Sequence, residues 1–196
     1  MSTQPQAATQ PVVLRQGGAV LVPVVVWLFA LLAVGDAVVE GTASYVVHVV
    51  ALMAAISLAT WLVLASPCLV VEPAGLRIVN PLRVHRVPFE VLEGVRVRGL
   101  TQVTARQEGG DSTTITSWNA PGMARRAGTE PQPDAVEVVV ERRRSAWERG
   151  VRDRGAPATV DAALVPVLAT TWRWQPALAL GVLVLANISI WLRWVS

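Results

Sequence analysis

Residues 75–89, in the middle of the chain, read GLRIVNPLRVHRVPF. Apolar Leu76 and Ile78 alternate with Arg77, an Asn-Pro pair interrupts the run, and a second short run follows. Alternation with a period of two is typical of a half-buried β-strand, and Asn-Pro is a turn signal. The stretch therefore predicts a β-hairpin.

Short runs of the same type lie on both sides of this hairpin. The whole series comprises CLVVE, LRIV, LRVHRV, GVRVR, TQVTAR and STTITSW, at 68–72, 76–79, 82–87, 94–98, 101–106 and 112–118. Turn residues separate the runs, above all Gly109 and Gly110, because glycine accepts a positive φ without a steric penalty. The series predicts consecutive antiparallel strands.

The stretch at 133–155 predicts a helix. Pro133 and Asp134 suit its first turn, and Gly155 suits its end. One face is apolar, with Val136, Val139, Val140, Trp147 and Val151, and the opposite side carries Arg142, Arg144, Glu148 and Arg152. Several strands followed by one amphipathic helix predict an antiparallel β-barrel or sandwich that a C-terminal helix caps, within a single domain at 67–155.

Three apolar stretches have the length of membrane-spanning helices, at 19–39, 43–64 and 176–194. A helix needs about 20 mainly apolar residues to cross about 30 Å of hydrocarbon, and tryptophans favour the interfaces, as at Trp172 and Trp174. The first stretch could instead be a cleaved signal peptide, but its thin positive flank argues against that. We therefore expect an α+β membrane protein with three transmembrane helices.

The segments between these stretches complete the predicted organisation. Only a short loop joins the first two spans, so residues 19–66 predict an antiparallel helical hairpin. We expect a flexible N-terminal tail at 1–18 and a linker at 156–175.

The placement of arginines predicts the orientation in a cell membrane. The loop between the first two spans has no arginine and is bordered by Asp36 and Glu40. Arginines follow the second span and precede the third, at Arg77, Arg83, Arg86 and Arg173. Because arginine collects on the cytoplasmic side, the N-terminus and the domain are expected in the cytoplasm and the C-terminus outside.

The middle of the chain also resembles a known family. The features that carry the resemblance are Gly75 before a strand, the turn Asn80-Pro81-Leu82-Arg83, Val87-Pro88-Phe89 before EVLEGV, and Trp118 with Pro121-Gly122. Together they resemble the bacterial pleckstrin-homology-like (PH-like) domain of small actinobacterial membrane proteins, and are similar to the low-molecular-weight antigen relatives of that group. The resemblance implies a fold with flanking membrane spans, and it implies no reaction.

Candidate binding residues lie in the hairpin and after the last strand. Arg83, His85 and Arg86 are close to the membrane end of the domain, where each basic residue near an anionic leaflet is worth about 1 kcal/mol. Trp118 could recognise a headgroup or a peptide. The alternatives are a solvated strand face for the three basic residues and, for Trp118, packing over the open end of the barrel.

Asp36, His48 and Asn187 are unusual because ionisable and polar side chains are rare inside apolar spans. A tight hairpin places Asp36 and His48 at similar depth. They could form a structural pair, with Asn187 as a third partner at matching depth, or a proton or ion relay.

The remaining sequence patterns argue against several classes of function. The sequence has no Ser-His-Asp or Cys-His spacing, phosphate loop or metal motif, so we expect no enzyme, cofactor or metal. The basic groups lack interleaved aromatics, which argues against nucleic acid. The single cysteine, Cys68, is expected to be a small buried apolar residue.

We therefore predict a membrane-anchored interaction or scaffold module. Its partners are the lipid bilayer and a protein partner, another copy of the chain or the inner-leaflet surface. The alternative is an accessory or oligomeric transport or channel component that uses Asp36 and His48 inside the membrane.

Overall fold

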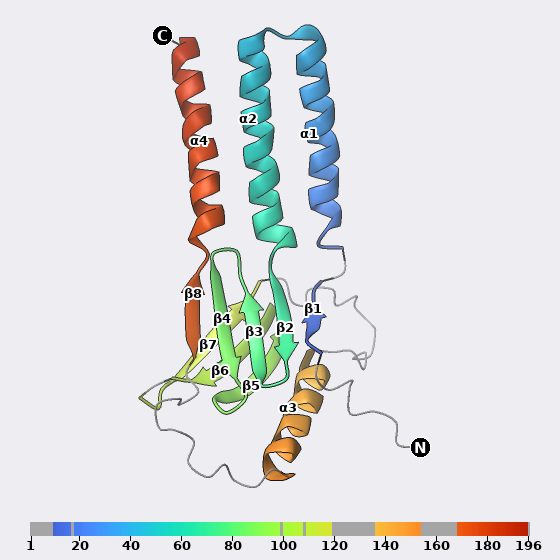
Figure 1. Ribbon diagram of the computed structural model, residues 1–196, viewed down its shortest axis with the longest axis vertical. Helices are drawn as coiled ribbons and strands as arrows, with labels where there is room; N and C mark the ends of the chain where they lie inside the picture. Colours follow the sequence, from blue (N-terminus) through green and yellow to red (C-terminus); the bar gives the residue numbers. More distant parts are fainter. Residues whose placement is uncertain are drawn as a thin grey trace. The chain divides into compact units, whose positions relative to one another are not determined.

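The computed structural model describes residues 10–16, 18–98, 100–107, 109–118, 136–153 and 168–195 (Figure 1). The chain divides into two compact units. The strand domain comprises Met1–Gln16 and Pro67–Thr171, and the helical unit comprises Gly17–Ser66 and Trp172–Ser196.

The first sheet of the strand domain has five strands in the order β1-β2-β3-β4-β8. They are β1 (Val12–Leu14), β2 (Cys68–Glu72), β3 (Gly75–Val79), β4 (Arg83–Pro88) and β8 (Ala169–Trp172). Strands β3 and β4 form the antiparallel hairpin predicted at 75–89, with Leu76 opposite Val87 and Ile78 opposite His85. Cys68 at the start of β2 is buried, as predicted.

The second sheet has three antiparallel strands in the order β5-β6-β7, and it lies behind the first sheet in the view of Figure 1. They are β5 (Leu92–Arg98), β6 (Leu100–Arg106) and β7 (Ser112–Ser117). The turn between β6 and β7 contains Gly109 at φ 116° and Gly110 at φ 89°, which confirms the predicted need for positive φ.

The core of the strand domain lies between the two sheets and one helix. Helix α3 (Val136–Asp153) buries Val136 and Val140 in this core, and the Trp147 ring lies 5.9 Å from the ring of Phe89. The apolar face predicted for this helix is therefore confirmed. The predicted start at Pro133 and Asp134 and the predicted end at Gly155 lie outside the described residues.

The helical unit contains α1 (Leu21–Glu40), α2 (Ala43–Thr60), the π-helical turn η2 (Trp61–Ala65) that continues α2, and α4 (Trp174–Val195). Among the described residues three helices are long and apolar enough to cross a membrane, at Leu21–Glu40, Ala43–Ala65 and Trp174–Leu192. Helix α2 packs against both α1 and α4. The three predicted apolar helices are confirmed.

Polar contacts fix the ends of α2. The backbone N–H of Tyr45 donates to the Thr42 hydroxyl at 3.4 Å, which caps the first turn. At the other end, the Arg173 guanidinium donates to Ser66 Oγ at 2.5 Å and so ties the start of α4 to the end of η2.

Two strands were not predicted. Strand β1 falls in the segment 1–18 that was expected to be a tail, and it pairs with β2 through Val13 and Val70. Strand β8 falls in the segment 156–175 that was expected to be a linker. Both are too short for an alternating pattern to show in the sequence, and each depends on a neighbouring strand for its hydrogen bonds.

Candidate functional site

The register of β4 divides the three predicted basic residues between two faces of the first sheet. His85 lies opposite buried Ile78, and alternation places Arg83 on the same face. Arg86 lies opposite Arg77 on the other face. Arg83, His85 and Arg86 therefore do not form one basic surface.

His85 is half-buried beside β8, and its Nδ1 lies 2.9 Å from Thr170 Oγ1. Burial, with a smaller contribution from the positive charge of Arg83, holds the pKa of His85 below its ordinary value of 6.5. The imidazole is therefore mainly neutral at neutral pH, and the positive charge of this part of β4 comes from its arginines.

Trp118 is exposed directly after β7, and its backbone is tied to the hairpin turn. The Trp118 N–H donates to Asn80 Oδ1 at 3.1 Å, and Asn80 Nδ2 donates to the Thr116 carbonyl at 2.9 Å. The structure therefore brings Trp118 together with the turn that contains Arg83. It leaves the indole in solvent and does not pack it over the core.

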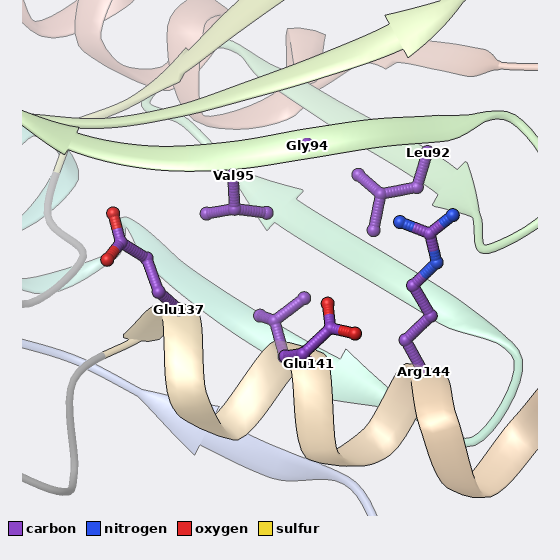
Figure 2. Close-up of a pocket in the computed structure, with 7 residues that line it drawn as sticks. Leu92, Gly94, Val95, Glu137, Glu141 and Arg144 are labelled. Atoms are coloured by element: carbon purple, nitrogen blue, oxygen red, sulfur yellow. The ribbon is translucent and has the colours of Figure 1, made fainter.

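A groove of about 380 Å³ separates β5 from α3 (Figure 2). Its lining residues are Leu92, Gly94, Val95, Glu137, Val140, Glu141 and Arg144. In Figure 2 the side chains of Leu92 and Val95 point from the strand toward the helix, and those of Glu137, Glu141 and Arg144 point from the helix toward the strand. The groove thus has an apolar base between charged side chains.

The β5 side of the groove is the edge of the second sheet. Edge strands present backbone N–H and C=O groups that a further strand can use. Glu137 Oε1 already accepts a hydrogen bond of 2.9 Å from the Val97 N–H, which fixes the first turn of α3 against the end of β5. The pairing with β6 shifts register between Leu92 and Gly94, so the edge is irregular at two of the residues that line the groove.

The α3 side of the groove is acidic overall. Arg144 Nε donates to Glu148 Oε1 at 3.1 Å, so its charge is partly balanced along the helix. Glu137 and Glu141 contribute two carboxylates on the same side. This arrangement favours a ligand that carries positive charge.

The three polar residues of the apolar helices form no hydrogen bond or ion pair with one another in the described part of the chain. Within the described residues no hydrogen bond or ion pair joins Asp36 to His48, and the Asp36 side chain is exposed on α1. His48 Nδ1 and Asn187 Oδ1 are buried without a hydrogen-bond partner. Asn187 Nδ2 donates to the Leu183 carbonyl within its own helix at 2.8 Å.

Two of the contacts that shape these sites were not predicted from the sequence. Asn80 was expected only as a turn residue, although it bridges the two sheets across 36 positions. Glu137 was not singled out, although a carboxylate in the first turn of a helix is a recognisable signal. In the part of the chain that the structure describes, no group of three His, Cys, Asp or Glu residues could hold a metal ion.

Comparisons of the chain with protein-family models, with curated proteins and with solved structures found no match. The resemblance to bacterial PH-like domains therefore stays a prediction from the sequence.

Proposed function

We propose that the chain is a membrane-anchored interaction module. The three apolar helices hold a PH-like strand domain at the cytoplasmic face of a cell membrane. The groove between β5 and α3 binds an extended, basic segment of a protein partner.

The outward-facing side chains of the helices support the anchoring. Large apolar residues such as Phe29, Leu31 and Val182 are exposed on the helical unit, and such surfaces are stable in hydrocarbon. Along the chain, Arg15 precedes the first apolar helix and Arg173 precedes the third, whereas the α1–α2 connection, residues 41–42, has no arginine. The positive-inside rule then favours a cytoplasmic strand domain.

The two antiparallel sheets followed by α3 agree with the fold that the PH-like resemblance implies. The β5 edge is the single observation that carries the binding proposal. An extended segment can pair with a free strand edge through its main chain, and side-chain pockets beside the edge then select its sequence. Val95 and Val140 provide an apolar base for such a segment, and Glu137 and Glu141 provide the charge. A partner segment of alternating apolar and basic residues fits this pattern.

A photo-crosslinker at position 94 of the full chain tests the proposal in cells. A Cβ built on Gly94 meets no atom within 4 Å, so a larger side chain has room there and lies in the groove. We expect a discrete protein adduct from this position and none from Thr114, which is exposed on β7. The Glu141→Arg variant should reduce the adduct strongly, because it reverses one of the two charges.

Glu90→Arg is the matched control, since Glu90 is exposed, lies outside the groove and gives the same change in net charge. The control variant should leave the adduct unchanged. An adduct that forms equally from Thr114, or that survives Glu141→Arg, contradicts binding in the groove. Extraction of the whole chain from membranes by alkaline carbonate contradicts the anchoring.

One observation favours a second candidate function, that of an accessory or oligomeric transport component. His48 on α2 and Asn187 on α4 each bury a polar atom without a partner, and these two helices contact each other. Purified chain in vesicles with an entrapped pH dye would then conduct protons, and Asn187→Leu would stop the flux. Absence of flux from the unaltered chain excludes this role.

A further inference from the structure

One corner of the strand domain exposes two large apolar side chains. Leu82, in the turn between β3 and β4, is 42% exposed, and Trp118, directly after β7, is 56% exposed. Among the described residues of the strand domain, the other large apolar side chains with comparable exposure are Val13 and Val138. We call Leu82 and Trp118 the apolar corner.

Asn80 holds the apolar corner together. Its side chain bonds to the Thr116 carbonyl at 2.9 Å and to the Trp118 N–H at 3.1 Å. Its own N–H donates to the Arg83 carbonyl at 2.8 Å across the turn that contains Leu82. One side chain thus joins the hairpin turn of the first sheet to the end of the second sheet, and the two apolar residues are presented on connected backbone.

Strand register places the apolar corner at the end of the sheet where the chain arrives from η2. Cys68, the first residue of β2, pairs with Val79, the last residue of β3, so β2 begins at the end where the β3–β4 turn lies. Only Ser66 and Pro67 separate Cys68 from the last residue of η2. Because one residue spans at most about 3.6 Å, the chain has little length between this end of the sheet and the apolar helix.

Strand β8 leaves the first sheet at the same end. His85 lies beside Thr170, and the Thr171 hydroxyl donates to the Val84 carbonyl at 3.5 Å, so β8 runs antiparallel to β4. Its last residues therefore lie toward the start of β4, where the turn is. Helix α4 begins at Trp174, directly after this strand. These two covalent links to the apolar helices leave from the end that carries the apolar corner.

The charge around the apolar corner matches the surface of an anionic bilayer. No acidic residue occurs between Glu72 and Glu90, and Arg83 stands directly beside Leu82. Tryptophan favours the interface between headgroups and acyl chains, and basic residues beside it are attracted to anionic lipids.

We propose that the apolar corner inserts into the headgroup boundary of the bilayer that holds the helices, with Arg83 directed to anionic headgroups. The inference rests on the anchoring proposed above, and it adds a second attachment that limits the rotation of the strand domain. The occupant is the lipid surface of the same membrane. The groove beside α3 then remains available for the protein partner.

Site-directed nitroxide labels on the full chain in vesicles test the insertion. In a Cys68→Ser background, single labels are placed through Leu82→Cys and Trp118→Cys. Asp111→Cys is the control at the other end of the second sheet, in the exposed β6–β7 turn. Val184→Cys on α4 reports whether the helices are in hydrocarbon. The relaxation of each label is measured once with oxygen and once with a water-soluble nickel complex. The ratio of the two effects gives the depth of the label in the bilayer.

We expect the labels at 82 and 118 to report the headgroup boundary, the label at 111 to report water and the label at 184 to report hydrocarbon. If the labels at 82 and 118 report water and the label at 184 reports hydrocarbon, the proposed insertion is wrong and the proposed anchoring still holds. A label at 184 that reports water overturns the anchoring, and the insertion with it.

Two further variants exclude a local effect of the label. Leu82→Glu should move the label at 118 into water, whereas Val138→Glu, an equally exposed change on α3, should leave its depth unchanged. Arg83→Gln should lower the ratio of inserted to free corner about fivefold in vesicles with phosphatidylglycerol, and have no effect in pure phosphatidylcholine. Equal effects of Leu82→Glu and Val138→Glu, or an Arg83→Gln effect that is independent of lipid charge, overturn the proposal.

Discussion

The strand domain and the helical unit place their large apolar side chains in opposite ways. In the strand domain residues such as Leu69, Ile78 and Phe89 are buried between sheets and helix, and few large apolar side chains are exposed. In the helical unit several of the buried residues are small, such as Ala37 and Ala55, and most of the leucine, valine and phenylalanine side chains are exposed, although Leu62 and Val49 are buried.

This difference is the one expected if the helical unit lies in a bilayer, as proposed above, and the strand domain lies in water. Burial from water stabilises the strand domain by about 25 cal/mol for each Å² of apolar surface. The same term cannot hold helices together in hydrocarbon, where small residues instead permit close packing. Equivalent substitutions should therefore have different effects in the two units, and three pairs of identical residues allow the comparison.

The largest difference is expected for phenylalanine. Phe89 is 1% exposed and contacts the ring of Trp147, whereas Phe29 on α1 is 64% exposed. Phe89→Ala should destabilise the strand domain by about 3–5 kcal/mol because it leaves a cavity. Phe29→Ala should change stability by less than about 0.5 kcal/mol. Hydrogen exchange of the full chain in bilayers measures both.

A second pair uses glycine and predicts opposite signs. A Cβ on Gly75 would lie 2.5 Å from the Val87 carbonyl oxygen and 2.9 Å from Pro88 Cα, and both are backbone atoms. Gly75→Ala should therefore cost about 1–3 kcal/mol. Gly35, inside α1, has no atom within 4 Å of that position, so Gly35→Ala should stabilise the helix by about 0.5–1 kcal/mol. Thermal unfolding in detergent, with hydrogen exchange to assign each unit, checks the two signs.

The third pair compares two asparagines. Asn80 makes two side-chain hydrogen bonds between the sheets, and Asn80→Ala should cost about 1–3 kcal/mol because the Trp118 N–H and the Thr116 carbonyl lose their partner. Asn187 buries an oxygen without a partner, so Asn187→Leu should be neutral or stabilising. Strong destabilisation by Asn187→Leu would show that this oxygen has a partner in the membrane, such as water or a second copy. Unfolding in detergent and in bilayers distinguishes the outcomes.

Local patterns in the sequence were sufficient to predict most elements of the fold. Alternation around Ile78 predicted the hairpin, Gly109 and Gly110 predicted a turn with positive φ, and the length of the mainly apolar stretches predicted the three helices. These features depend on neighbouring residues alone. Strands β1 and β8 each pair with a strand from elsewhere in the chain, and their own short sequences have no pattern that predicts this pairing.

The candidate sites were harder to predict because they depend on contacts between distant segments. Arg83 and His85 lie on the same face of β4, but the half-burial of His85 depends on its contact with Thr170 of β8, 85 positions away. The position of Trp118 depends on Asn80, which is far from it in sequence. A groove between a strand edge and a helix likewise has no signature in either segment.

The smallest expected effect is the response of the strand domain to acid. The pKa of His85 is lowered in the folded state, so the unfolded chain binds this proton more readily, and stability decreases as the pH falls through 6.5. Hydrogen bonds from Ser112, then Arg106, lower the pKa of Glu93, so its stabilisation is present above pH 4.5 and is lost below it. Unfolding followed from about pH 7.5 to about pH 3.5 should show both steps.

Two variants assign these steps. His85→Gln should remove the step near pH 6.5 and keep the lower one, and Glu93→Gln should do the reverse. The helical unit is an internal reference. Its hydrogen exchange, corrected for the intrinsic pH dependence, should be the same in both variants and in the unaltered chain. A step near pH 6.5 that survives His85→Gln would mean that the step comes from another group of the strand domain, whose pKa is lower in the folded chain than in the unfolded chain. The half-buried contact between His85 and Thr170 would then not be the acid-sensitive point of the first sheet.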